Sequence, residues 1–235
     1  MAATLQTLHA LQSVLQRPDV WRGDQLAGQG QAGLSSGFPV LDAELPGSGW
    51  PRGALTELIP AHSGIGELAL LQPALRECVK QAPVAVLAPP YRPHAPAWAA
   101  SLPLERMLWI EASGKEVAWA AECLLDSGAL GALLVWLPAQ TDARALRRLQ
   151  LAAEGHAAPA FVFRSLQTLR QASPAPLRLA LSGSALGVQV QILKRRGPPC
   201  ERPLCLPVER PVAQSRLAAR LTPVPVLHVL QAAWA

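Results

Sequence analysis

The sequence predicts an α/β fold in which a mostly parallel sheet carries helices on both faces and ends in an antiparallel hairpin. Short apolar runs alternate with segments of helical periodicity through residues 54–164, the pattern produced by successive βαβ units. These runs are apolar at every position rather than at every second one, as expected for strands that are buried on both faces. Two strands joined by a short turn replace this alternation near the end of the chain.

Five of the apolar runs are expected to form parallel strands, and helices are expected between them. The predicted parallel strands span residues 54–59, 84–88, 107–110, 130–137 and 160–164. Predicted helices span residues 67–80, 96–100 and 114–127, and a short helix lies within residues 38–45. A further, basic helix carries Arg144, Arg147 and Arg148. The hairpin pairs residues 177–181 with residues 188–193, where Val188, Val190 and Ile192 alternate with glutamines.

The chain divides into a core and two flanking segments. Residues 1–33 are expected to form an N-terminal amphipathic helix, with apolar residues at helical spacing over 4–16, followed by a linker rich in Gly, Gln and Ser. Residues 34–197 form the predicted core, and residues 198–235 a Pro/Arg-rich tail whose last apolar run, 224–234, is a docking helix or a short linear motif. We expect Trp21 and Trp50 to lie near the surface, where tryptophans often anchor interfaces.

The charge of the chain is distributed unevenly. Residues 1–140 hold 8 Lys/Arg and 12 Asp/Glu, a net charge of −4, whereas residues 141–235 hold 13 and 4, a net charge of +9. A basic segment of this kind contacts nucleic acid or an acidic protein surface, or is simply a solvated face. The candidate contact residues are Arg144, Arg147, Arg148, Lys194, Arg195 and Arg196.

Composition excludes several other classes of function. We expect no transmembrane helix, because no apolar run is long enough, and no secretory signal at the N-terminus, so a cytoplasmic location is expected. The four cysteines, Cys78, Cys123, Cys200 and Cys205, contain no C-x-x-C pair, which indicates reduced structural thiols. The five histidines form no local cluster. The sequence therefore predicts neither a metal site nor a catalytic thiol.

One stretch has the layout of a phosphate-binding loop without its chemistry. The first predicted strand is followed by a turn rich in Ser and Gly and then by a helix, but the pattern G-x-x-x-x-G-K-[ST] is absent. Without gaps, Gly66 takes the place of the lysine and Glu67 that of the hydroxyl residue; shifted by one residue, Glu67 takes the place of the lysine. A carboxylate there repels a triphosphate and suits the helix dipole as a first-turn residue. The degenerate loop positions are Pro60, Ser63, Gly64, Gly66 and Glu67.

Four motifs together resemble the RecA-like core, and in particular the ImuA family of translesion-synthesis accessory proteins, which is related to the cell-division inhibitor SulA. Three of them lie in the core: GWPRGALTEL at residues 49–58, DSGAL leading into LLVW over residues 126–136, and VQVQILKRRG at residues 188–197. The fourth, LQRPDVWRG at residues 15–23, resembles the N-terminal segment of the ImuA family and separates it from the recombinases.

The resemblance implies the loss of a nucleotide-hydrolysing site. A recombinase ends its second core strand in a carboxylate that activates water, and here Ala88, Pro89 and Pro90 follow that strand. The central strand of a recombinase ends in an Asp that serves Mg²⁺, and here it ends in Val135-Trp136-Leu137-Pro138. Phosphoryl transfer depends on such positioned charges. The resemblance therefore implies a pseudo-ATPase with no catalytic residue, cofactor or metal.

The resemblance also implies a role in the SOS response. ImuA-type proteins act in damage-induced mutagenesis with ImuB, an inactive homologue of the Y-family polymerases, with RecA and, indirectly, with an error-prone replicative polymerase. We therefore expect an adaptor in translesion DNA synthesis and mutagenic DNA repair, cytoplasmic and associated with the nucleoid during DNA damage. Two alternatives remain open at this point, a module that binds single-stranded DNA and a SulA-like inhibitor of cell division.

Overall fold

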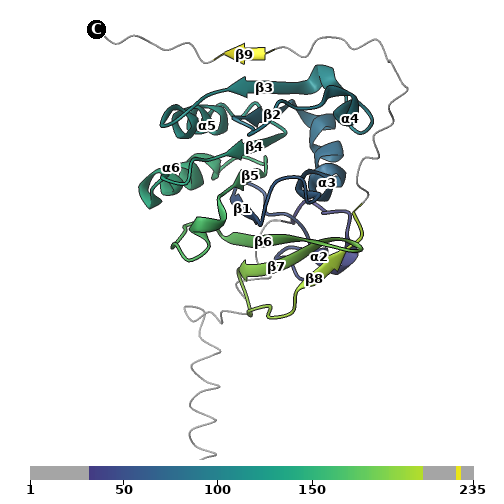
Figure 1. Cartoon of the computed structure of the whole chain (residues 1–235). Coiled ribbons are helices and arrows are strands. Elements are labelled where there is room, and N and C mark those ends of the chain that lie inside the picture. Colours follow the sequence, from purple (N-terminus) through teal and green to yellow (C-terminus); the bar gives the residue numbers. More distant parts are fainter. Residues whose placement is uncertain (1–31, 209–225, 229–235) are drawn as a thin grey trace, which may run out of the picture.

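A single mixed sheet organises the computed structural model, which describes residues 32–208 and 226–228 (Figure 1). Its strand order is β8-β7-β6-β1-β5-β4-β2-β3-β9. The pairs β6/β7 and β7/β8 are antiparallel, and every other neighbouring pair is parallel. The strands are β1 Leu55–Pro60, β2 Val84–Leu87, β3 Met107–Glu111, β4 Ala132–Trp136, β5 Ala160–Phe163, β6 Leu177–Ser184, β7 Gly187–Lys194, β8 Leu204–Leu206 and β9 Val226–His228.

Helices cover both faces of this sheet, which confirms the predicted fold class. Helix α3 lies on one face, and α5 and α6 lie side by side on the other (Figure 1). The α-helices are α2 Pro39–Asp42, α3 Glu67–Gln81, α4 Ala95–Ala99, α5 Glu116–Asp126 and α6 Ala143–Ala153, and two short 3₁₀ helices are η1 Leu104–Arg106 and η2 Leu166–Thr168. Each helix predicted within this range is present, with its ends moved by a few residues.

The two faces of the strands form two separate hydrophobic cores. In β1, Leu58 packs toward α3 together with Phe161 of β5, whereas Leu55 packs toward α5 and α6 together with Val162. Successive side chains of a strand point to opposite faces, so a strand covered on both sides needs apolar residues at consecutive positions. This is why the continuous apolar runs of the sequence predict these strands correctly.

Trp50 lies in the interior, and the prediction that it is a surface residue is wrong. Its side chain is 0% exposed, and its ring packs edge-on against Phe161 with the ring centroids 5.4 Å apart. Leu34 pairs with Trp50 through backbone hydrogen bonds in both directions. The segment from residue 34 to residue 50 therefore folds back on itself and covers the α3 side of the core.

The packed part of the chain continues past the expected boundary at residue 197. Strand β8 pairs with β7, with Leu204 opposite Val190 and Leu206 opposite Val188. Leu206 and Val208 are buried in the same core as α3. The segment 198–208 was interpreted as tail because its Pro and Arg content hides a short edge strand.

Part of the last apolar run adds a strand to the other edge of the sheet. Strand β9 runs parallel to β3, with Trp109 opposite Val226. For these residues the structure shows a strand where the sequence suggests a docking helix or a linear motif. The predicted helix over 4–16 and Trp21 lie outside the described residues. Within the described part of the chain, no helix has the length and apolar character needed to cross a membrane.

Candidate functional site

The degenerate loop joins the carboxyl end of β1 to the first residue of α3. Pro60 ends β1, Ser63 is exposed, and Gly66 precedes the helix. Gly66 has a φ of 105°, and a Cβ atom on it would meet Cγ2 of Val188 at 3.0 Å. Both the left-handed backbone and this close contact require glycine at position 66. The strand, loop and helix therefore follow one another as the sequence predicts.

The carboxylate of Glu67 occupies the backbone N–H groups of this loop. Its Oε1 accepts a hydrogen bond from the Gly64 N–H at 2.9 Å, and its Oε2 accepts one from the Gly66 N–H at 3.1 Å. The residue is only 7% exposed. In a working phosphate-binding loop such N–H groups point at phosphate oxygens. Here the chain supplies its own anion, which the interpretation of Glu67 as an ordinary first-turn residue did not foresee.

A hollow of about 370 Å³ adjoins the loop. It is lined by residues of the loop and of the first turns of α3, together with Trp98 of α4 and Leu102. Glu67 is the only charged residue among those that line it. An incoming triphosphate therefore meets apolar surface and a carboxylate, with none of the cations that normally neutralise phosphate oxygens.

The strands β2 and β4 end in residues without acidic groups. After β2, Ala88 has a φ of 50° and its N–H donates to the carbonyl of Ile110. At the end of β4, Trp136 stacks on Phe163 of β5, with ring centroids 4.2 Å apart and planes inclined by 5°. An alanine and a stacked tryptophan provide neither a base nor a ligand for Mg²⁺.

The basic helix places three of the six candidate contact residues on its outer face. Arg144, Arg147 and Arg148 of α6 are exposed, opposite the side on which Leu146 and Leu149 are buried. Arg148 forms an ion pair with Glu122 of α5, with its Nη2 2.9 Å from Oε2. Both partners keep contact with solvent, so the pair contributes about 0–1 kcal/mol and leaves Arg148 free to exchange partners.

The other three candidates lie at the end of β7, and two of them are held by the chain itself. The Lys194 Nζ donates to the Ser173 carbonyl at 2.8 Å. Arg195 donates to Oε2 of Glu44 at 2.6 Å and to the Pro198 carbonyl at 2.6 Å. Arg196 is exposed. Lys194 and Arg195 thus have structural contacts, whereas Arg196 has no ion pair within the described part of the chain.

A buried cluster of charged side chains, which the sequence did not predict, joins the neighbouring strands β1 and β6. Glu57, in the middle of β1, is 1% exposed. Its Oε2 accepts a hydrogen bond from Nε of Arg178 on β6 at 2.7 Å, and its Oε1 accepts one from the Ser173 hydroxyl at 2.5 Å. Arg178 also donates to the carbonyls of Gln171 and Thr168. The sequence does contain a signal for this cluster, because Glu57 and Arg178 are charged residues within two otherwise uncharged strands.

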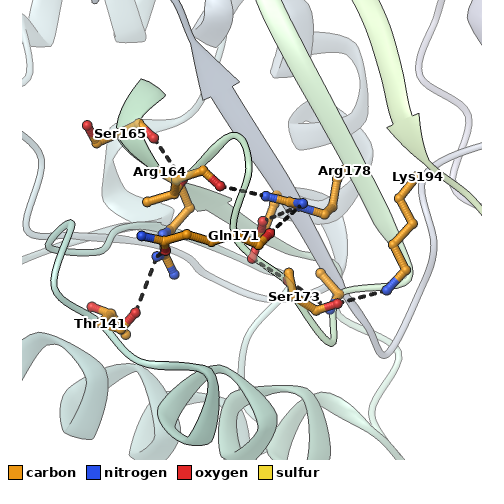
Figure 2. Close-up of polar contacts among 10 residues, drawn as sticks. Thr141, Arg164, Ser165, Gln171, Ser173, Arg178 and Lys194 are labelled. Atoms are coloured by element: carbon orange, nitrogen blue, oxygen red, sulfur yellow. Dashed lines mark hydrogen bonds and ion pairs between the residues drawn. The ribbon is translucent and has the colours of Figure 1, made fainter.

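Arg164 completes this cluster at the carboxyl end of β5. It is 3% exposed, and Figure 2 shows its guanidinium between Thr141 and Gln171. Burial lowers the pKa of Arg164, an effect partly offset by the negative charge of Glu57 and reinforced by the positive charge of Arg178. Burial and then Arg178 also lower the pKa of Lys194, again against the attraction of Glu57.

The cysteines behave as structural or surface thiols. Burial raises the pKa of Cys78 to about 11, so this thiol is protonated at neutral pH and is a poor nucleophile. Cys123 and Cys205 are exposed. Within residues 32–208 and 226–228, no three His, Cys, Asp or Glu side chains are grouped closely enough to hold a metal ion.

Comparisons with known proteins show a similarity to solved structures. No family model matches this sequence, and no curated protein matches it. The chain is similar to the crystal structure of SulA from Pseudomonas aeruginosa, with 25% sequence identity and a TM-score of 0.40; the match covers 49% of this chain and 99% of that chain. The fold class rests on the sheet itself, and the resemblance to the ImuA family stays a prediction.

The role of Glu67 leads to a prediction about stability. We expect Glu67→Ala to lower the free energy of unfolding by about 1–3 kcal/mol, because two loop N–H groups lose a charged acceptor. Chemical denaturation monitored by circular dichroism measures the change. Glu116→Ala is the matched control, because Glu116 is likewise the first residue of a helix. An equal loss in both variants would mean that Glu67 acts only through the helix dipole.

Proposed function

We propose that this protein is a non-catalytic RecA-like adaptor in SOS-induced translesion DNA synthesis. The observation that carries the proposal is the carboxylate of Glu67 bound to the N–H groups of Gly64 and Gly66. A carboxylate that binds two N–H groups of the loop removes these donors from phosphate and places a negative charge beside them. A RecA-like sheet without a nucleotide site retains surfaces for binding other proteins.

The absence of ATP hydrolysis is part of this proposal. Three groups that support phosphoryl transfer are replaced at once, by Glu67 in the loop, by Ala88 after β2 and by Trp136 at the end of β4. Each such group contributes several kcal/mol to transition-state stabilisation in enzymes that use it. Their joint replacement supports a pseudo-ATPase, and turnover of ATP above background would refute it.

The partners follow from the resemblance to the ImuA family. We propose an ImuB-like inactive polymerase homologue and RecA as direct partners, and an error-prone replicative polymerase as an indirect one. The flanking segments 1–31 and 209–235 are the proposed contacts for the polymerase-like partner. The tail contact begins after Val208, because residues up to that position are packed in the core.

Copurification with each partner tests the adaptor role. The full chain is expected to retain both proteins, and variants that lack residues 1–22 or residues 229–235 are expected to lose one of them while keeping the circular dichroism spectrum of the core. Deletion of residues 209–235 would also remove β9 from the sheet. A deletion from residue 198 is unsuitable, because it removes β8. Retention of neither partner by the full chain would refute the proposal. Filamentous growth on overexpression would instead favour a SulA-like inhibitor.

The exposed arginines of α6 favour a second candidate function, binding of single-stranded DNA. Affinity for DNA depends on clustered positive charge and falls steeply with salt concentration. The variant Arg144→Ala/Arg147→Ala/Arg196→Ala removes exposed cations without breaking the contacts of Lys194 and Arg195. Salt-dependent binding by the parent chain that this variant loses would support the candidate. Single-strand readers usually add aromatic stacking, which the α6 face lacks.

A further inference from the structure

The buried cluster around Glu57 holds more positive than negative charge. It contains three cations, Arg164, Arg178 and the nearby Lys194, but a single carboxylate, that of Glu57. Both oxygens of that carboxylate are already bound, one to Arg178 and one to Ser173. Glu57 therefore neutralises Arg178, and Arg164 is left without a hydrogen-bonded carboxylate among the described residues.

The hydrogen bonds of Arg164 are few and long. Its Nη2 donates to the Thr141 carbonyl at 3.3 Å and to Oε1 of Gln171 at 3.5 Å. Its Nε and Nη1 are fully buried and have no hydrogen-bond partner among the described residues. Buried polar groups are almost always paired, because an unpaired one costs about 1–3 kcal/mol and a charged one more. Nη2 shares one edge of the guanidinium with Nε and the other with Nη1, so an oxyanion that takes the place of the Gln171 amide on Nη2 can bind through two parallel hydrogen bonds, to Nη2 and to one of the free donors.

The position of Arg164 also points to a ligand. It follows the last residue of β5, and Thr141 lies in the loop after β4. In open α/β sheets, ligands bind outside the carboxyl ends of the parallel strands. Gln171 is exposed, and among the described residues its side-chain amide contacts only Arg164, at 3.5 Å. A small anion that displaces this amide reaches the guanidinium directly, from the side on which Figure 2 shows Gln171.

We propose that Arg164 binds a compact oxyanion, a phosphate or carboxylate group, at the carboxyl end of β5 in place of the Gln171 amide. This site is distinct from the loop at Gly64–Glu67, where the chain supplies its own carboxylate, and it does not depend on the adaptor role. The oxyanion would neutralise the excess charge of the cluster and pair with one of the two free donors of Arg164.

Thermal unfolding of the full chain in phosphate tests the site. Phosphate replaces chloride at constant ionic strength, and acetate is used in a parallel series. We expect saturating phosphate, acetate or both to raise Tm by about 2–4 °C. A rise in acetate identifies a site open to carboxylates, and a rise in phosphate alone identifies a phosphate site. No rise in either anion overturns the proposal.

Two variants separate this site from the general stabilising effect of phosphate on folded proteins. Gln171→Glu places a carboxylate beside Arg164, so we expect a higher Tm in chloride and no further rise in the anion that stabilises the parent. Gln167→Glu is the matched control, because it adds the same charge to the same loop, and it should keep the response of the parent. The proposal is overturned if Gln171→Glu responds like the parent.

Removal of the guanidinium gives an independent check. Arg164→Met is expected to lose the response to the anion, whereas Arg147→Met, which removes an exposed arginine of α6, is expected to keep it. If Arg164→Met does not fold, the comparison of Gln171→Glu with Gln167→Glu decides the question alone. An anion response that survives in a folded Arg164→Met variant also overturns the proposal.

Discussion

Replacing Glu57 with Gln should lower the free energy of unfolding by about 3–5 kcal/mol, because the change leaves the charges of Arg178 and Arg164 buried without their anion. Glu57 is 1% exposed and its ion pair with Arg178 measures 2.7 Å. Because both side chains are buried, solvent and salt screen the attraction between their charges only weakly. Urea unfolding of the parent chain and the variant, followed by circular dichroism, measures the loss.

A surface ion pair and a double variant are the controls for Glu57. Glu77→Gln breaks the exposed pair with Lys80 and should change stability by less than about 0.5 kcal/mol. The double variant Glu57→Gln/Arg178→Met should lose less unfolding free energy than the two single variants added together, because it removes the positive charge of Arg178 together with the carboxylate of Glu57. A loss below 1 kcal/mol for Glu57→Gln would show that the buried charges find other partners.

Replacing Trp50 with Ala should cost about 3–5 kcal/mol, the range for removing a large aromatic side chain from a packed core. The side chain is 0% exposed and packs on Phe161 within the α3-side core, a cluster that also contains Leu41 and Leu45. Its Nε1 has no hydrogen-bond partner among the described residues. Trp50→Phe should therefore cost much less, because it keeps a ring against Phe161 and removes the unpaired donor.

An exposed tryptophan provides the matched comparison for Trp50. Trp119 of α5 is 54% exposed, and Trp119→Ala should change stability by less than about 0.5 kcal/mol. Equilibrium unfolding of the three variants in the same denaturant gives the order of the losses. Similar small losses for Trp50→Ala and Trp119→Ala would mean that Trp50 is a surface residue, as its sequence context suggests.

The local pattern of the sequence was sufficient to predict most of the elements. Strands buried on both faces need consecutive apolar residues, and helices beside them need a 3.6-residue period, so each element from β1 to β7 is visible in its own segment. Strand β8 was missed because it has three residues and lies among prolines. The absence of the phosphate-binding pattern from the loop and of acidic residues from the ends of β2 and β4 was also predictable, because each feature is defined by residue types at fixed spacing.

The sequence by itself determined the fold class, the order of the elements and the absence of the pattern G-x-x-x-x-G-K-[ST] after the first strand. Only the tertiary structure decided where the isolated charges and large side chains go. Glu57 and Arg178 are 121 residues apart in the chain, Trp50 meets Phe161 in the α3-side core, and Arg164 is buried by loops that follow two different strands. Such contacts depend on strand order and on burial, which act between segments distant in sequence. The direction of the Glu67 side chain is also a tertiary result, because its first-turn position allows the carboxylate to face either solvent or the loop.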